Sequence, residues 1–261
     1  MPPNPNIFFP VSPGLRKFYH PNNCSDTPFH IVCKYGHMKI AKLLLQKSTD
    51  LNIDLNARDN CIWGCTAFIL ACSNGHSEIA EMLVSKLAET NIELNAKTKI
   101  QGMTGFLWAC QNGHSNLVQM LVDKSTEYQI DIFSKDNLAS TAVHFACFDG
   151  HLKIVEILIE KSLEFFNEKN VKDMYSRTPF YKACAEGHFD VAKTLMQKSV
   201  YLKLNLNSKT VLGVTAFHAA CRRGHKAIVE MIMDNAAIYQ IDLNLKDDEV
   251  REGFGNTIQS K

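Results

Sequence analysis

A Gly-His pair recurs six times along this chain at nearly constant spacing, and this repetition restricts the fold more than any other feature. Successive glycines are 39, 38, 37, 37 and 37 residues apart. A threonine stands nine residues before each glycine and a cysteine three residues before it. The glycines are Gly36, Gly75, Gly113, Gly150, Gly187 and Gly224, and the threonines are Thr27, Thr66, Thr104, Thr141, Thr178 and Thr215. Self-similarity at a period of about 20–50 residues indicates a stacked repeat architecture.

Each copy predicts two helices. The threonine is a favourable N-cap, Pro28 and Pro179 occupy the tolerated first helical position, and the glycine suits a left-handed C-cap. A second helix follows with a broad apolar face, as at Ile154, Val155, Ile157 and Leu158. One short helix pair cannot cover such a face, so we expect neighbouring copies to stack as a solenoid. Segments such as IDLN at 53–56 and IELN at 92–95 predict extended fingers that end in turns.

The segments TPFHIVCKYGH at 27–37, TPFYKACAEGH at 178–188 and TAFHAACRRGH at 215–225 resemble the ankyrin signature. The resemblance implies an all-α helical repeat solenoid with β-hairpin or extended fingers between repeats, and protein binding on the concave face. We expect a Pro-rich extension over residues 1–24 and six repeats over 25–254. Their bounds are about 25–63, 64–101, 102–138, 139–175, 176–212 and 213–254, and residues 255–261 begin a truncated seventh.

The copies are longer than the usual ankyrin period of about 33 residues. Their extra residues follow the second helix, and they number about four, close to the 3.6 residues of one helical turn. We therefore predict an outer helix that is longer by one turn. Two fingers depart from the pattern, because copy four carries NEKN at 167–170 and copy three has Phe133 where other copies have asparagine. We expect distortion there.

Histidine and cysteine could indicate catalysis or metal binding, but the repeat accounts for most of them. Six of the ten histidines follow the repeat glycine, and His30, His144 and His218 share a second column. Six of the nine cysteines form one column on the first helix, which leaves Cys24, Cys61 and Cys65. Cys61 and Cys65 have no second ligand pair at zinc-site spacing, so a redox-sensitive pair and an ordinary loop remain open. We expect no catalytic site, cofactor or metal, because no phosphate-binding loop, nucleophile elbow or zinc-protease motif occurs.

Charge and hydropathy argue against several classes of partner. Lys and Arg total 28 against 27 for Asp and Glu, so no global field attracts nucleic acid. The basic group of Arg222, Arg223 and Lys226 is small and local. No signal peptide or membrane span is expected. We therefore expect the nine cysteines in a reducing compartment, the cytoplasm or the nucleus, where free thiols are the default.

A partner protein is expected on the two residues before each glycine, which differ between copies. The candidate binding residues at these positions are Tyr35, Asn74, Asn112, Phe148, Asp149, Glu186, Arg222 and Arg223, and Trp63 of the first finger is a further candidate. The aromatic and arginine members are favoured because these types are enriched in interface anchors. A merely solvated face remains the alternative in copies two and three. Trp108 is expected in the core instead.

These observations favour a non-enzymatic protein-interaction module or scaffold. A regulatory inhibitor or targeting subunit is the alternative, acting by masking a transcription factor or presenting substrates to a ubiquitin ligase. The ankyrin portion of a larger channel or scaffold is a further one. The sixth outer helix has no complete neighbour in the sequence. We therefore expect a longer chain, a partner, a second copy or fraying at that open C-terminal end.

Overall fold

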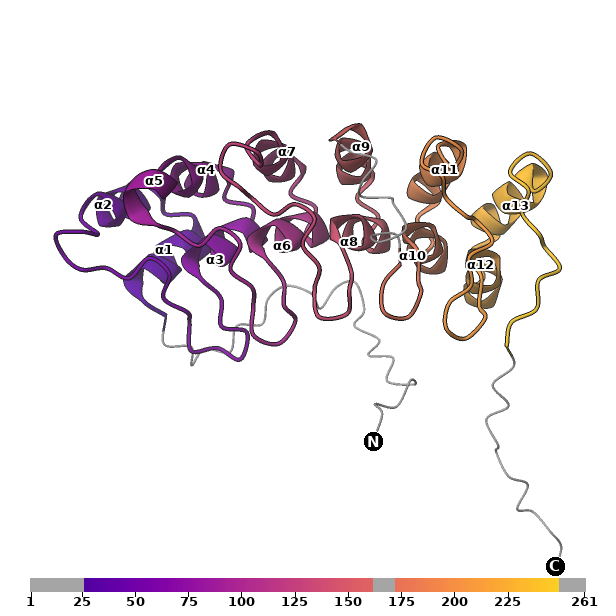
Figure 1. Ribbon diagram of the computed structural model, residues 1–261, viewed down its shortest axis with the longest axis horizontal. Helices are drawn as coiled ribbons and strands as arrows, with labels where there is room; N and C mark the ends of the chain where they lie inside the picture. The colour runs from indigo at the N-terminus through magenta and orange to yellow at the C-terminus, as the bar shows by residue number, and fades with distance from the viewer. Residues whose placement is uncertain (1–25, 162–171, 249–261) are drawn as a thin grey trace, which may run out of the picture.

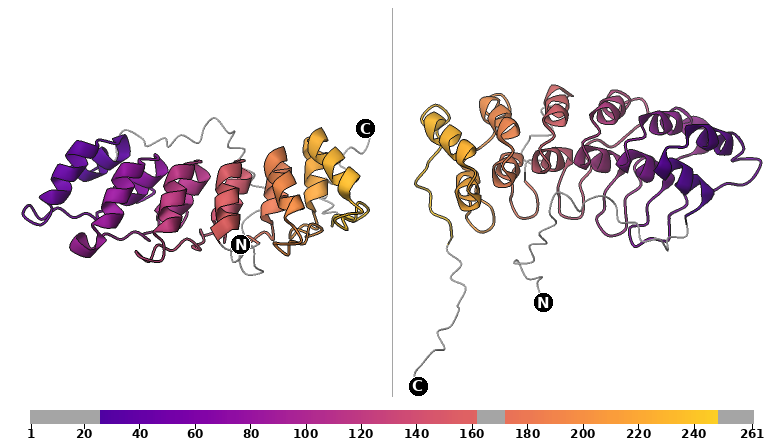
Figure 2. Two further views of the ribbon diagram at one scale, coloured as in Figure 1. Left: turned by 90° about the horizontal axis from the view of Figure 1, so that it is seen from above. Right: turned by 180° about the vertical axis from the view of Figure 1, so that it is seen from behind.

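The computed structural model describes residues 26–161 and 172–248, and there it shows helix pairs stacked side by side. Two rows of helices form a gently curved array, with finger loops on the side of the inner row that faces away from the outer row (Figure 1). The inner row comprises α1 (Pro28–Tyr35), α3 (Ala67–Ser73), α6 (Gly105–Gln111), α8 (Ala142–Phe148), α10 (Pro179–Glu186) and α12 (Ala216–Arg223). The outer row comprises α2 (Met38–Gln46), α4 (Ser77–Ser85), α7 (Ser115–Asp123), α9 (Leu152–Lys161), α11 (Phe189–Gln197) and α13 (Lys226–Asn235). A helical repeat solenoid is thereby confirmed, and Figure 2 shows the pairs in sequence order.

The expected extension at 1–24, the seventh copy at 255–261 and the NEKN segment at 167–170 lie outside the described residues. Within them, the six threonines are the N-caps of the six inner helices, as predicted. In α10, for example, the Tyr181 N–H donates to Thr178 Oγ1 over 3.1 Å. The six repeat glycines all adopt positive φ, between 73° and 83°. That left-handed conformation ends each inner helix and turns the chain toward the outer row.

The prediction of a longer outer helix is wrong. In copy one, α2 ends at Gln46, and the following residues form a separate helical turn in which the Leu51 N–H donates to the Lys47 carbonyl over 2.9 Å. The break falls at the Lys-Ser pair, where the Ser48 hydroxyl donates to the Leu45 carbonyl over 2.7 Å. A serine that bonds its own preceding turn competes with continued helix. Among the copies whose turn the structure describes, copy two alone makes this turn helical enough to count as a helix, α5 (Leu87–Thr90).

Each finger closes through a backbone hydrogen bond, and neighbouring fingers are joined by another. In the fourth finger, the Asp173 N–H donates to the Arg177 carbonyl over 3.1 Å. The Met174 N–H reaches the Leu138 carbonyl of the preceding finger over 2.9 Å. The finger that contains Phe133 closes in the same way, so the distortion expected there is absent. The fingers are hairpin-like, but no strand occurs among the described residues.

The core runs continuously between the rows. The column cysteines of the first five copies, Leu121 and Trp108 are all buried, with Trp108 only 8% exposed, so the core position expected for Trp108 is confirmed.

The histidine that follows each glycine joins its repeat to the one before. In the preceding repeat, the residue two positions before the glycine has its carbonyl oxygen 2.8–3.0 Å from Nε2 of this histidine. The five histidine–carbonyl pairs are His76–Lys34, His114–Ser73, His151–Gln111, His188–Phe148 and His225–Ala185. Because a carbonyl can only accept, Nε2 carries the proton in each pair.

Candidate functional site

The tips of the fingers carry a row of exposed apolar side chains that the sequence analysis did not single out. Between 36% and 64% of each side chain is exposed, and every described finger contributes at least one. We call this row the finger-tip ridge; its members are Ile62, Ile100, Leu138, Met174, Tyr175, Val211 and Leu212. Surface apolar residues are ordinary when scattered singly, whereas these recur at the same place on successive structural units.

Turn geometry places these side chains outward. Each tip contains one residue in the left-handed region, which is glycine in three fingers but Ala139 (φ 58°) and Ser176 (φ 57°) in the other two. The apolar residue precedes that position by one or two residues, so the reversal of the chain leaves it at the outermost point. An apolar residue three or four positions before every repeat threonine after Thr27 was the sequence signal that could have revealed the ridge.

Two of the expected binding residues, Tyr35 and Trp63, differ in how far they are exposed. Tyr35 is 61% exposed at the end of α1, and the Lys34 ammonium lies 5.6 Å from the centre of its ring. Trp63 follows Ile62 in the first finger, is half-buried and packs against the core. Tyr35 therefore presents an exposed ring, whereas Trp63 mainly supports the finger.

Three expected residues from the middle copies belong partly to the scaffold. Asn112 donates its side-chain amide to the Ser73 carbonyl of the preceding repeat over 2.7 Å. Asn74 donates to the Leu70 carbonyl of its own helix over 2.8 Å. Asp149 is the half-buried C-cap residue of α8. These contacts give each side chain a structural role, and their part in binding stays a prediction.

The charged candidates in the last two copies are paired within the chain. Arg223 Nη1 lies 2.8 Å from Glu186 Oε2, and Arg222 Nη2 lies 3.2 Å from Asp247 Oδ2. Arg222 remains exposed. This end of the inner row therefore presents a mixed-charge surface whose ion pairs a partner could exchange.

A buried ion cluster lies beside the expected residue Phe148. The inner-helix column that holds Ile31, Leu70, Trp108, Phe145 and Ala219 contains Lys182 in the fifth copy. Lys182 Nζ lies 3.2 Å from Asp173 Oδ2 and 5.7 Å from the centre of the Phe148 ring. The Asp173 carboxylate is fully buried and also accepts from Arg177 Nε over 2.8 Å. A charged residue in an otherwise apolar column was the signal that the sequence analysis missed.

Burial governs the electrostatics of this cluster. It lowers the pKa of Lys182, and the Arg177 charge lowers it further, while Asp173 opposes both. Burial alone would raise the pKa of Asp173, but Lys182 and Arg177 hold it below its usual value. Burial also lowers the pKa of His144 to about 3, with Lys182 as the second cause. The cluster is therefore a neutral imidazole beside one carboxylate that is paired with two cations.

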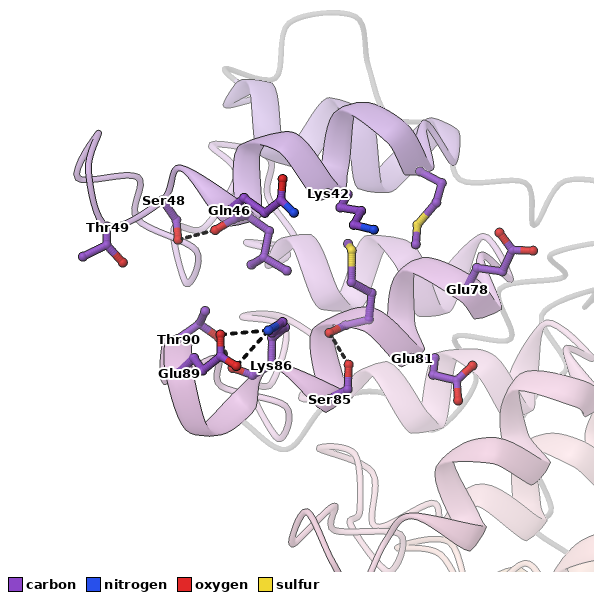
Figure 3. Close-up of a pocket in the computed structure, with 13 residues that line it drawn as sticks. Lys42, Gln46, Ser48, Thr49, Glu78, Glu81, Ser85, Lys86, Glu89 and Thr90 are labelled. Atoms are coloured by element: carbon purple, nitrogen blue, oxygen red, sulfur yellow. Dashed lines mark hydrogen bonds and ion pairs between the residues drawn. The ribbon is translucent and has the colours of Figure 1, made fainter.

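A pocket of about 680 Å³ lies between the outer helices of the first two copies (Figure 3). Met38 and Met82 contribute apolar surface, Lys42 comes from α2, and Glu78 and Glu81 come from α4. Several polar groups around it are already bonded locally; Lys86 Nζ, for example, lies 2.8 Å from Glu89 Oε1. No convergent set of free polar groups defines a ligand, so we assign none.

Asp59 and Cys61 of the first finger lie close to Asp26, the residue before the N-cap of α1, and the possible ligand atoms of the three lie within 4.8 Å of one another. Cys61 is disulfide-bonded, so it offers no thiolate. The expectation of free thiols is therefore wrong at this position. Cys65 is a buried free thiol, and burial raises its pKa to about 12. A Cys61–Cys65 redox pair is not formed, and the cellular location stays a prediction.

Comparison with known proteins identifies one family. The family model described as ankyrin repeats (3 copies) matches residues 12–98, 87–170 and 163–247. No curated protein matches the chain. Over the described ranges, no helix has the length and apolar character that crossing a membrane requires.

Proposed function

This chain belongs to the ankyrin repeat family, whose repeats generally serve as protein-interaction modules, and from that premise we propose that it binds another protein without catalysing a reaction. The binding surface is the concave face, formed by the finger-tip ridge and the glycine-proximal ends of the inner helices. The finger-tip ridge is the observation that carries the proposal.

The ridge supports this function because its apolar character recurs while its chemistry differs between copies. Isoleucine, leucine, methionine, tyrosine and valine occupy comparable tips, whereas the framing columns of threonine, cysteine, glycine and histidine stay constant. A requirement of the fold alone would produce buried residues, but these side chains are exposed. Varied side chains on a fixed scaffold suit recognition of one particular partner surface.

The ends of the inner helices add specificity beside this apolar row. Tyr35 offers an exposed ring in the first copy, and Arg222 offers an exposed guanidinium in the sixth. Aromatic and arginine side chains are enriched among residues that carry most of the binding energy in interfaces. We therefore expect an elongated partner that contacts several copies, with apolar side chains over the fingers and an acidic group near Arg222.

The experiment compares two triple variants of the full chain in quantitative affinity purification followed by mass spectrometry. Ile100→Ser, Leu138→Ser and Met174→Ser remove the middle of the ridge. Leu51→Ser, Val200→Ser and Ile238→Ser are the matched control, because these residues are 63%, 83% and 71% exposed in the separate turns beyond the outer helices. Both triples replace exposed apolar surface with hydroxyl groups, so neither should alter stability greatly.

We expect the ridge triple to reduce capture of the partner at least about tenfold, which corresponds to about 1.4 kcal/mol. The control triple should capture the partner as the wild type does. Tyr35→Ala and Arg222→Ala should each weaken capture less. Equal capture by both triples would refute the assignment of the binding surface.

A further inference from the structure

The five interfaces between successive repeats share one arrangement, and within the described residues the outward sides of the first and sixth repeats each show half of it. In each interface a histidine Nε2 bonds to the carbonyl two residues before the preceding glycine. A methyl group added to that glycine would lie within 2.6 Å of the same ring at Gly36, Gly75, Gly113, Gly150 and Gly187. The histidine ring therefore fills the space above the glycine and satisfies the exposed carbonyl at the same time.

The far side of the sixth repeat has the acceptor half of this interface without its histidine. No atom of the described residues lies within 4 Å of the position that a methyl group on Gly224 would take. Cys221 is exposed, although the equivalent cysteines of the other five copies are fully buried. On the outer helix, Met233 is 54% exposed, whereas the equivalent Met196 in the fifth copy is 2% exposed. We call this surface the C-face.

The near side of the first repeat has the donor half. His37 occupies the bridging position, but its ring stacks only on Tyr35, at 6.2 Å, and makes no hydrogen bond within the described chain. Ile40 is 50% exposed, although the equivalent Ile79 is 1% exposed. Ile31 is 41% exposed where the equivalent Leu70 is fully buried. We call this surface the N-face.

We propose that the C-face of one copy of this chain docks on the N-face of a second copy, so that the repeats continue head to tail across the contact. The two faces are the two sides of one repeated interface, which already occurs five times within the chain. His37 of one copy would fill the space over Gly224 of the other and donate to the Arg222 carbonyl. Ile40 would be covered by the α13 surface that includes Met233.

A contact of this kind is heterologous, since different surfaces of the two copies meet. Each associated pair still exposes one N-face and one C-face, so association continues to longer chains unless something caps an end. The contact uses neither the finger-tip ridge nor the inner-helix positions assigned to partner binding, apart from the backbone of Arg222. It therefore stands or fails separately from the proposed function.

Sedimentation velocity of the full chain over a wide concentration range tests the proposal. We expect average mass to rise with concentration through dimers to larger species. Ile40→Glu blocks the N-face, and Met233→Glu blocks the C-face. Because both residues are exposed in the single chain, neither variant should unfold it. Each should weaken self-association at least about tenfold, while Val200→Glu, at another exposed apolar position, should not.

Sedimentation velocity of a mixture of the two blocked variants is the decisive measurement. Ile40→Glu retains an intact C-face and Met233→Glu an intact N-face, so the mixture should form dimers and stop there. A symmetric dimer would not be restored by mixing. Wild-type chain that stays monomeric at every concentration would overturn the proposal, as would a mixture in which the two variants do not associate.

Discussion

Removing the Asp173 carboxylate gives the most informative perturbation of the fold. The Lys182 ammonium lies 3.2 Å from Asp173 Oδ2, with only 9% of the lysine side chain exposed. Asp173 Oδ1 also accepts from the backbone N–H groups of Tyr175 and Arg177, over 3.0 and 2.9 Å. Asp173→Ala would therefore leave the buried Lys182 ammonium without its counter-charge. It would also leave the N–H groups of Tyr175 and Arg177 without their acceptor. Breaking such a buried pair costs about 3–5 kcal/mol.

The opposite replacement should have little cost. Lys182→Met places an apolar side chain in a column that is apolar in the other copies, and Asp173 keeps its bonds to Arg177 and the finger backbone. Replacing a buried ionic group by an apolar one of similar volume is often neutral or stabilising, by up to about 4 kcal/mol. Lys153→Met, on the exposed face of α9, is the matched control and should change stability by less than about 0.5 kcal/mol.

The free energy of unfolding, measured by urea denaturation and circular dichroism, completes the double-mutant cycle. In the Lys182→Met background, Asp173→Ala should cost at least about 1.5 kcal/mol less than in the wild type, because no buried ammonium remains to be compensated. An equal cost in both backgrounds would refute the reasoning. The carboxylate would then act only on the finger backbone.

Three further predictions concern the core, its histidine and one finger tip. Leu121→Ala, at a fully buried position, should cost about 2–5 kcal/mol through the cavity it leaves, and an unchanged melting temperature would contradict that core position. Because the folded-state pKa of His144 is about 3, below the unfolded value of about 6.5, its stabilising contribution is complete above about pH 6.5. It falls toward pH 3 by up to about 1.4 kcal/mol per pH unit. His144→Gln should therefore show a shallower loss of stability on acidification than the wild type, and parallel pH profiles would contradict this. Ala139→Gly should raise the unfolding free energy by about 0.5–1 kcal/mol, because it relieves a left-handed conformation that costs alanine about 1–3 kcal/mol; a lower melting temperature would contradict it.

The sequence predicted the helix pairs well because their determinants are local. A threonine before a helix and a glycine after it act within a few residues, so the caps of all six inner helices could be placed from the pattern. The length of the outer helices could not be predicted. There, the Ser48 hydroxyl and the left-handed Asn52 (φ 51°) decide that the extra residues form a separate turn.

The candidate site was less predictable, because it depends on which side chains remain exposed after stacking. Asn112 precedes a glycine as a binding residue should, but it reaches back to the preceding repeat. Ile100 resembles an ordinary loop residue in the sequence, yet it is 54% exposed at a finger tip. Only the arrangement of neighbouring repeats separates side chains that join the copies from those that face a partner.

Hydrogen exchange on the complex with the captured partner tests the central claim most directly. The measurement compares backbone amides of the finger tips, at residues 60–64, 98–102, 136–140, 173–177 and 210–214, with those of the separate turns at 48–52 and 199–203. We predict slower exchange in several successive finger tips on binding and unchanged exchange in the turns. Slower exchange confined to the turns and outer helices, with unchanged finger tips, would contradict the account.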